Sequence, residues 1–326
     1  MREAAFLKEN AESWKQFEML LDQRRNVNPD VLAELFVRLT DDVAYARTFY
    51  PDSKTTKYLN TLAARVHQEI YRNKREKSNR FINFWRLEVP EAVYESRGAL
   101  LTSLVIFLLA MLVGVVSTLN DEKFIRLILG DEYVNMTLEN IRNGDPLGIY
   151  SKHDQLSMFA TITFNNILVS FYAFAMGLLI SFGTGYVLLQ NGIMLGAFQT
   201  LFYKHGLLAK SFLVVYIHGT FEISAIVVAG GAGLVMGNSI LFPGTYSRLE
   251  SFRRGAKRGT KIIIGLVPFF FIAGFLESFV TRYTNMPLIL SLLIIFGSLA
   301  VMVYYFVIYP ETLHRKKNHA EHSTEN

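Results

Sequence analysis

Five long apolar runs constrain the fold of this chain more than any other feature of its sequence. They lie at about residues 100–119, 159–189, 212–241, 262–280 and 287–309. The hydrocarbon core of a bilayer is about 30 Å thick, and about 20 helical residues span it. Because 51% of the residues are hydrophobic as well, the chain does not fit a soluble globular class. The sequence therefore predicts an all-α, polytopic helical membrane protein.

The first 79 residues lack such a run and predict a cytoplasmic, soluble helical bundle. Asn28-Pro29 and Pro51 divide this region into three stretches. Asp30 is the expected cap of the second helix, and Asp52 or Ser53 that of the third. In each stretch apolar residues recur at helical spacing. These predicted core positions are Trp14, Phe17, Leu20, Leu21, Leu32, Leu35, Phe36, Leu39, Val43, Leu59, Leu62, Val66 and Ile70.

The remaining chain is expected to form three further parts. Residues 80–97 mix aromatic and charged side chains, which is typical of an amphipathic elbow lying along the membrane interface. A fourth helix of the soluble bundle is the alternative for this stretch. Residues 98–310 are expected to form the transmembrane domain, with an exterior loop at about 120–157, and residues 311–326 a polar cytoplasmic tail.

Charge next to the apolar runs predicts the orientation. Lys and Arg gather at residues 72–97, 248–261 and 315–317, which indicates that these segments face the cytoplasm. In the connection 248–261 the basic residues are Arg248, Arg253, Arg254, Lys257, Arg258 and Lys261. The loop 120–157 has more acids than bases and is expected outside. We therefore expect a bacterial cytoplasmic (inner) membrane protein with both termini in the cytoplasm, and we expect no nucleic acid partner.

Five crossings alone do not satisfy this orientation, because the basic connection 248–261 would then lie outside. One more short or re-entrant segment is needed, and residues 192–203 are the best candidate. A break at Gly230-Gly-Ala-Gly233 is the alternative. We expect six membrane segments, five long and one short, with Gly192, Gly196 and Gly219 as glycines of the broken region.

Polar residues inside the apolar runs mark a candidate site. His218 and Glu222 lie four residues apart on one helix face, and Asn165 and Asn166 lie in an earlier run. A carboxylate at the middle of a bilayer costs roughly 3 kcal/mol on insertion scales, so it needs a partner. His218, an asparagine amide or an exposed backbone N–H can donate a hydrogen bond to Glu222. A structural clamp is the favoured interpretation, followed by a substrate or ion pathway and by catalysis.

Other chemistry has little support in the sequence. A zinc protease motif on a helix needs a second histidine, which His218-Gly-Thr-Phe-Glu222 lacks. There is no cysteine, no phosphate-binding glycine loop and no nucleophile elbow. We expect no cofactor and no metal. Glu277, followed by Arg282, is predicted to be an interfacial charge at the outer end of its span.

Small residues recur at four-residue spacing, which lets helix backbones approach closely. The pairs are Gly192 with Gly196, Gly233 with Gly237, and Gly177 with Ser181 and Gly185. Packing within one subunit is the first expectation, and a homodimer face is the second.

The polar motif and its surroundings resemble the stage II sporulation protein M family. The resemblance rests on His218-Gly219-x-x-Glu222, on Asn165-Asn166 and on Asn191-Gly192-x-x-x-Gly196. Weaker similarities to the longer members lie at Trp14, Tyr45-Ala-Arg47, Tyr58-Leu-Asn60, Ala64-Arg65-Val-His67 and Phe84 to Pro90. The resemblance as a whole covers about residues 10–310.

The resemblance implies a membrane component of a cell-envelope remodelling complex. The family's named member works with peptidoglycan-cutting partners during engulfment and is not known as the cutting enzyme. We therefore expect a non-enzymatic protein that assembles partners at the membrane. Its expected partners are the lipid bilayer, a second copy in a homodimer, and envelope or peptidoglycan-remodelling proteins. A transporter or channel with a polar site at Asn165, Asn166, His218 and Glu222 is the alternative, and an intramembrane hydrolase using Glu222 is the second alternative.

Overall fold

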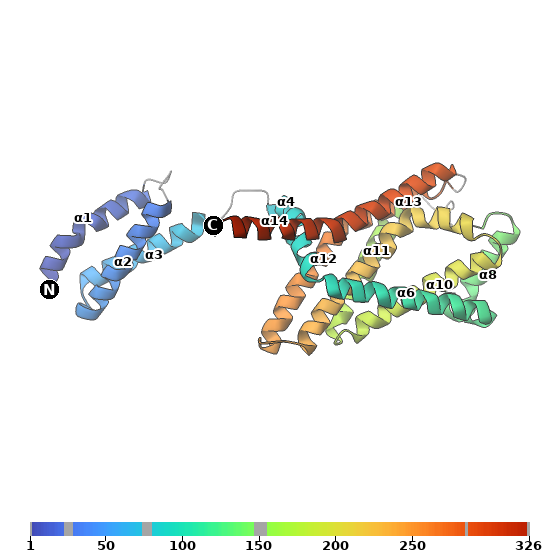
Figure 1. The fold of residues 1–326 in the computed structure, drawn as a ribbon, viewed down its shortest axis with the longest axis horizontal. Helices are drawn as coiled ribbons and strands as arrows, with labels where there is room; N and C mark the ends of the chain where they lie inside the picture. The colour runs from blue at the N-terminus through green and yellow to red at the C-terminus, as the bar shows by residue number, and fades with distance from the viewer. Residues whose placement is uncertain (1, 23–28, 74–79, 147–154, 284–285, 325–326) are drawn as a thin grey trace. The chain divides into compact units, whose positions relative to one another are not determined.

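The computed structural model describes residues 2–22, 29–73, 80–146, 155–283 and 286–324, and it is helical throughout its regular structure (Figure 1). This confirms the predicted fold class. The chain divides into two compact units, Met1–Asn79 and Arg80–Asn326. Each unit is described by itself below.

The first unit is a bundle of three helices, α1 (Glu3–Asp22), α2 (Pro29–Phe49) and α3 (Lys54–Asn73). Aromatic and aliphatic residues from all three helices form its core. The buried members are Phe6, Trp14, Phe17, Leu39, Val43, Ala46, Leu59 and Leu62. The Trp14 indole also donates a hydrogen bond to Asp42 Oδ2 at 2.7 Å, which ties α1 to α2.

The predicted core positions of this bundle are confirmed where the structure describes them. Trp14, Phe17, Leu39, Val43, Leu59 and Leu62 are buried, and Phe36 packs against them. The other predicted positions, Leu20, Leu21, Leu32, Leu35, Val66 and Ile70, lie outside the described side chains.

The helix boundaries follow the expected signals with one difference. The Ser53 hydroxyl accepts from Thr56 N–H at 3.1 Å and so caps α3, which leaves Asp52 outside the cap. α2 begins at Pro29, so Asp30 lies in its first turn and the predicted cap at Asp30 is wrong. Proline is well suited to a first helical position because its missing N–H has no partner there.

The second unit contains six long helices and several short ones (Figure 1). Three short elements precede the first long helix: α4 (Arg80–Asn83), the π-helical turn η1 (Phe84–Glu88) and α5 (Val89–Glu95). The following elements are α6 (Arg97–Asn120), α7 (Glu122–Leu129), α8 (Asp131–Arg142), α9 (Gln155–Ala175), η3 (Met176–Leu178), α10 (Phe182–Lys204), α11 (Leu208–Leu241), α12 (Arg248–Phe275), η4 (Leu276–Val280), α13 (Leu288–Val303), η5 (Tyr304–Ile308) and α14 (Tyr309–Thr324).

Helix α11 is the central helix of this unit. It packs against α6, α9, α10, α12 and α13. In the most apolar 18-residue stretch of α11, 61% of the residues are buried. The corresponding fraction is 22% for α6 and 17% for the segment formed by α9 and η3. The main core lies between α11 and α12, where Phe221, Ala225, Ile262, Leu266 and Phe270 are buried together.

The outer helices leave large apolar side chains exposed. Helix α6 exposes Leu101, Leu104, Val105, Leu108, Leu109, Leu112, Val113 and Val116, and α13 exposes Leu288, Ile289, Leu290, Leu293, Phe296, Leu299, Val301 and Val303. Patches of this extent are rare on soluble monomers and match a surface that faces lipid. Five helical segments are long and apolar enough to span a membrane. The chain is a multi-pass membrane protein.

The structure differs from the prediction at the turn 179–181 and in the helix that follows it, where the sixth segment was expected. The apolar run 159–189 does not form one span, because the chain turns at Leu179–Ser181, where Ile180 and Ser181 have φ values of 53° and 66°. The following helix α10 has 23 residues and is therefore about 34 Å long, enough to cross a bilayer. Residues 192–203 therefore lie inside α10, a helix longer than the predicted short segment but not one of the five candidate spans. The alternative break at 230–233 is wrong, because these residues lie inside continuous α11.

Gly192, Gly196 and Gly219 are not break positions either, because all three lie inside continuous helices. Gly192 and Gly196 have a packing role. A Cβ atom at Gly192 would overlap Phe107 O on α6, and one at Gly196 would overlap Met111 O. The two glycines thus allow α10 to lie directly against α6.

A second small-residue contact joins the turn after α9 to α11. A Cβ atom at Gly177 would overlap the backbone of Gly233, and one at Gly237 would overlap Ser181. Close packing within one subunit is therefore confirmed for Gly177, Ser181, Gly233 and Gly237, whereas a Cβ atom at Gly185 would meet nothing within 4 Å.

The turn at Ile180 gives a testable prediction. A left-handed backbone costs an L residue about 1–2 kcal/mol, whereas added glycine freedom in the unfolded chain costs about 0.4–1 kcal/mol. We expect Ile180→Gly to raise the unfolding free energy by about 1 kcal/mol in a thermal unfolding series of the purified chain. Leu179→Gly is the matched control, because Leu179 has φ −80°, and it should lower stability. Equal losses in both variants would contradict strain at Ile180.

Candidate functional site

The structure brings three of the four predicted polar residues together. Asn166 on α9 donates a hydrogen bond from its amide Nδ2 to Glu222 Oε1 on α11. His218 lies four residues before Glu222 on the same helix, and only 4% of its surface is exposed. Of the three partners considered for Glu222, the asparagine amide is therefore present. Asn165 is exposed and lines the same cavity as the other three.

Helix α12 and its terminal turn supply two residues that sequence reasoning missed. His218 Nε2 lies 3.8 Å from Glu277 Oε1, and the Glu277 side chain is 14% exposed. His218 Nδ1 lies 2.9 Å from Thr281 Oγ1. The prediction of Glu277 as an interfacial charge is wrong, because its carboxylate points into the helix bundle.

The turn η4 explains how Glu277 reaches this position. Residues Leu276–Val280 form a π-helical turn, and Thr281 N–H bonds to Leu276 O at 2.8 Å, five residues earlier. A π-turn inserts one residue into the helical register and often occurs at functional sites. In this turn Glu277 and Thr281 both face His218.

A cavity of about 520 Å³ lies beside this polar cluster, which we define as Asn166, His218, Glu222, Glu277 and Thr281. Four cluster residues, Asn166, His218, Glu222 and Glu277, line it. The opposite walls include Phe107 on α6, Met194 on α10 and three residues of the short helices α7 and α8, namely Ile128, Leu129 and Tyr133. The cavity is thus bounded by membrane helices and covered at one end by α7 and α8.

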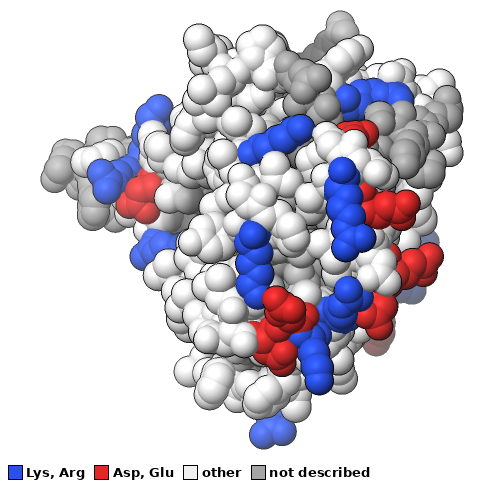
Figure 2. All heavy atoms as spheres, turned by 90° about the vertical axis from the view of Figure 1, so that its right-hand side faces the viewer, with Lys and Arg blue, Asp and Glu red and all other residues white. Residues whose placement is uncertain are grey.

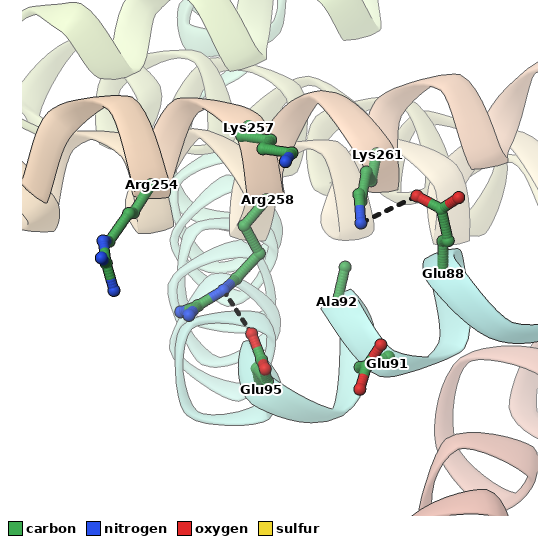
Figure 3. Close-up of a pocket in the computed structure, with 8 residues that line it drawn as sticks. All are labelled: Glu88, Glu91, Ala92, Glu95, Arg254, Lys257, Arg258 and Lys261. Carbon is green, nitrogen blue, oxygen red and sulfur yellow. Dashed lines mark ion pairs between the residues drawn. The ribbon is translucent and has the colours of Figure 1, made fainter. Parts of the chain in front are cut away.

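The predicted basic residues of 248–261 lie at a different place, on the first half of α12. Figure 3 shows two ion pairs made by α12: Arg258 pairs with Glu95 of α5 at 2.8 Å, and Lys261 pairs with Glu88 of η1 at 2.9 Å. Hydrogen bonding to Lys261 holds the pKa of Glu88 below its ordinary value. Arg254 pairs with Glu250 of its own helix at 2.8 Å. These residues and Arg248, Arg253 and Lys257 all lie on α12, so the predicted connection 248–261 forms the first part of that helix.

The predicted elbow, residues 80–97, is held by protein contacts. Val89 and Val93 are buried in the main core with α12 residues. Tyr305 O–H donates to Trp85 O at 2.7 Å, and Lys317 pairs with Glu91 at 2.6 Å. The fourth-bundle-helix alternative is wrong, because these residues pack in the second unit.

The fold and the site together define a multi-pass α-helical membrane protein whose helices enclose a buried histidine–carboxylate cluster. A family model described as Stage II sporulation protein M matches residues 103–282, more than half of the 326-residue chain. This chain therefore belongs to the stage II sporulation protein M family, and the matched range contains the whole polar cluster. A second model, described as a domain of unknown function (DUF8413), matches residues 4–72. No curated protein and no solved structure matches the chain.

Proposed function

We propose that this protein is a non-enzymatic membrane component that assembles envelope or peptidoglycan-remodelling proteins at the bacterial cytoplasmic membrane. The observation that carries the proposal is the presence of two helical parts outside the candidate spans. One is the three-helix unit, residues 1–79, with its own core. The other is the pair α7 and α8. The family name, which refers to sporulation, supports a role in envelope remodelling.

An even number of crossings supports the proposed orientation. The long helices are α6, α9, α10, α11, α12 and α13, and the short connections from α9 onward favour antiparallel neighbours. Six crossings bring residues 72–97, 248–261 and 315–317 to one side, where their Lys and Arg favour the cytoplasm. The helices α7 and α8 then face the exterior.

The α7–α8 surface is a rigid candidate for contact with an exterior partner. Ile125 of α7 and Val134 of α8 are buried against Ala197 and Leu201 of α10, which fixes both helices on the membrane unit. Leu127 of α7 is 80% exposed. Figure 2 shows acidic and basic side chains side by side on the face nearest α8, surrounded by uncharged surface. A surface that combines charged and uncharged side chains suits a protein partner.

Site-specific photo-crosslinking in native membranes tests the assembly role. A crosslinking residue at Leu127 or at Met136 of α8 should give discrete adducts with other proteins, because both side chains are exposed. Val37, exposed on α2, tests the first unit in the same way. The control is Leu109 on the apolar face of α6, which should contact only lipid. Absence of protein adducts at Leu127, Met136 and Val37 would contradict the assembly role.

The same experiment separates a homodimer from a complex with other proteins. With two differently tagged copies in one cell, a homodimer gives an adduct that carries both tags. An adduct that carries only one tag and is heavier than the single chain shows that the crosslinked partner is another protein.

A transporter or channel is the second candidate, and the cavity beside the polar cluster favours it. Polar sites at the middle of a helix bundle are typical of transporters. If the cavity is a pathway, vesicles containing the purified chain should show ion or proton flux that Glu222→Gln changes. Vesicles with no flux above protein-free vesicles would rule out this candidate without affecting the assembly role.

A further inference from the structure

Three metal-binding side chains converge at the wall of the cavity. His218, Glu222 and Glu277 each offer one ligand atom, and these three atoms all lie within 4.8 Å of one another. They come from two helical segments, α11 and η4, which the fold holds side by side. His218 is buried, and Glu222 and Glu277 are partly buried.

The negative charge of the Glu222 and Glu277 carboxylates must be neutralised by a cation or a proton. Two carboxylates at this separation in a low-dielectric site repel each other strongly when both are ionised. The Asn166 amide reduces the cost for Glu222 through one hydrogen bond, but it is neutral. A bound cation or a shared proton is therefore needed to hold Glu222 and Glu277 in place.

Hydrogen bonding orients the histidine as a ligand. Thr281 O–H donates to Leu276 O at 3.1 Å, so its oxygen accepts from His218 Nδ1–H at 2.9 Å. This places the proton of a neutral imidazole on Nδ1 and the lone pair on Nε2, the nitrogen that lies 3.8 Å from Glu277 Oε1. Metal-bound histidines in proteins usually have this arrangement, with the second ring nitrogen donating to an oxygen.

We propose that His218, Glu222 and Glu277 bind a divalent transition-metal cation, Zn²⁺ or Mn²⁺. One imidazole nitrogen with two carboxylate oxygens suits these ions, whereas Ca²⁺ and Mg²⁺ prefer oxygen ligands alone. Asn166 and Thr281 are positioning residues that orient Glu222 and His218. The cavity leaves room for water on the remaining coordination positions. The cation links α11 to the end of α12, and this role does not depend on the proposed assembly function.

Metal content of the purified full-length chain tests the proposal. The chain carries a tag without histidine, is stripped with a chelator, incubated with Zn²⁺ or Mn²⁺, desalted and analysed by mass spectrometry of the elements. The wild-type chain should retain about one ion per molecule. His218→Gln, Glu222→Gln and Glu277→Gln should each lose it. Glu311→Gln and His314→Gln, at half-buried positions of α14 outside the polar cluster, should retain it.

A second measurement tests metal binding even if one of the glutamine variants does not fold. Added metal should raise the thermal unfolding midpoint of the wild-type chain and leave that of Glu277→Gln unchanged, since binding to the native state alone stabilises it. Thr281→Val should weaken binding about 10- to 100-fold without abolishing it, as expected for a residue that only orients a ligand. A wild-type chain that retains neither ion overturns the proposal and leaves a shared proton as the neutralising charge. Retention by all three glutamine variants also overturns it.

Discussion

Replacing Asn166 by leucine is expected to lower the free energy of unfolding of the membrane unit by about 1–3 kcal/mol. The change removes the amide that donates to Glu222 and leaves a buried carboxylate oxygen without that donor. The measurement is denaturant-driven unfolding of the purified chain in bicelles, followed by helical circular dichroism.

The neighbouring asparagine provides the control for this prediction. Asn165→Leu is the same substitution one residue earlier in α9, at an exposed position, and should change stability by less than about 0.5 kcal/mol. If both variants lose the same stability, the loss comes from the altered helix rather than from the contact with Glu222. If neither loses any, the asparagine–glutamate contact does not hold α9 to α11.

Replacing Gly196 by alanine is expected to destabilise the chain by about 1–3 kcal/mol, because the new methyl group overpacks the α6–α10 contact. The overlapping atom is Met111 O, a backbone oxygen that cannot move without displacing α6. Alanine favours a helix over glycine by about 1 kcal/mol, so the packing cost must exceed that gain.

Gly185→Ala is the matched control on the same helix. A Cβ atom at Gly185 meets nothing within 4 Å, so this variant should be as stable as the wild-type chain or more stable by up to about 1 kcal/mol. The two unfolding midpoints, measured under the same conditions, should shift in opposite directions. A stabilised Gly196→Ala variant would mean that α6 and α10 are farther apart in the membrane.

Much of the fold could be predicted because hydrophobic length is a strong signal. The apolar runs place α6, α11, α12 and α13, and the basic residues of 248–261 require an even number of crossings. The location of the extra helix could not be predicted. Asn191-Gly192 has the composition of a break, but Gly192 serves a close helix contact. The actual turn contains Ile180 and Ser181, which rarely adopt a positive φ.

The candidate site could be predicted only along a single helix. Four-residue spacing places His218 and Glu222 on one face of α11, and an asparagine amide was among the partners considered for Glu222. Glu277 was misassigned because its position depends on the packing register of α11 against α12 and on the π-helical turn η4. Neither is encoded in a local pattern. A buried acid near a helix end therefore needs the tertiary register before its role can be assigned.

The ion pairs of Glu88, Glu91 and Glu95 imply the order in which parts of the membrane unit dock while the chain is being made. Glu88 and Glu95 are translated long before Lys261 and Arg258, and the partner of Glu91, Lys317, comes almost at the end of the chain. Glu88 and Glu95 cannot reach their partners until α12 has been made, and Glu91 cannot reach Lys317 until α14 has been made. Docking of α5 against α14 is therefore a late step, and a chain that stalls before α14 lacks the Glu91–Lys317 ion pair.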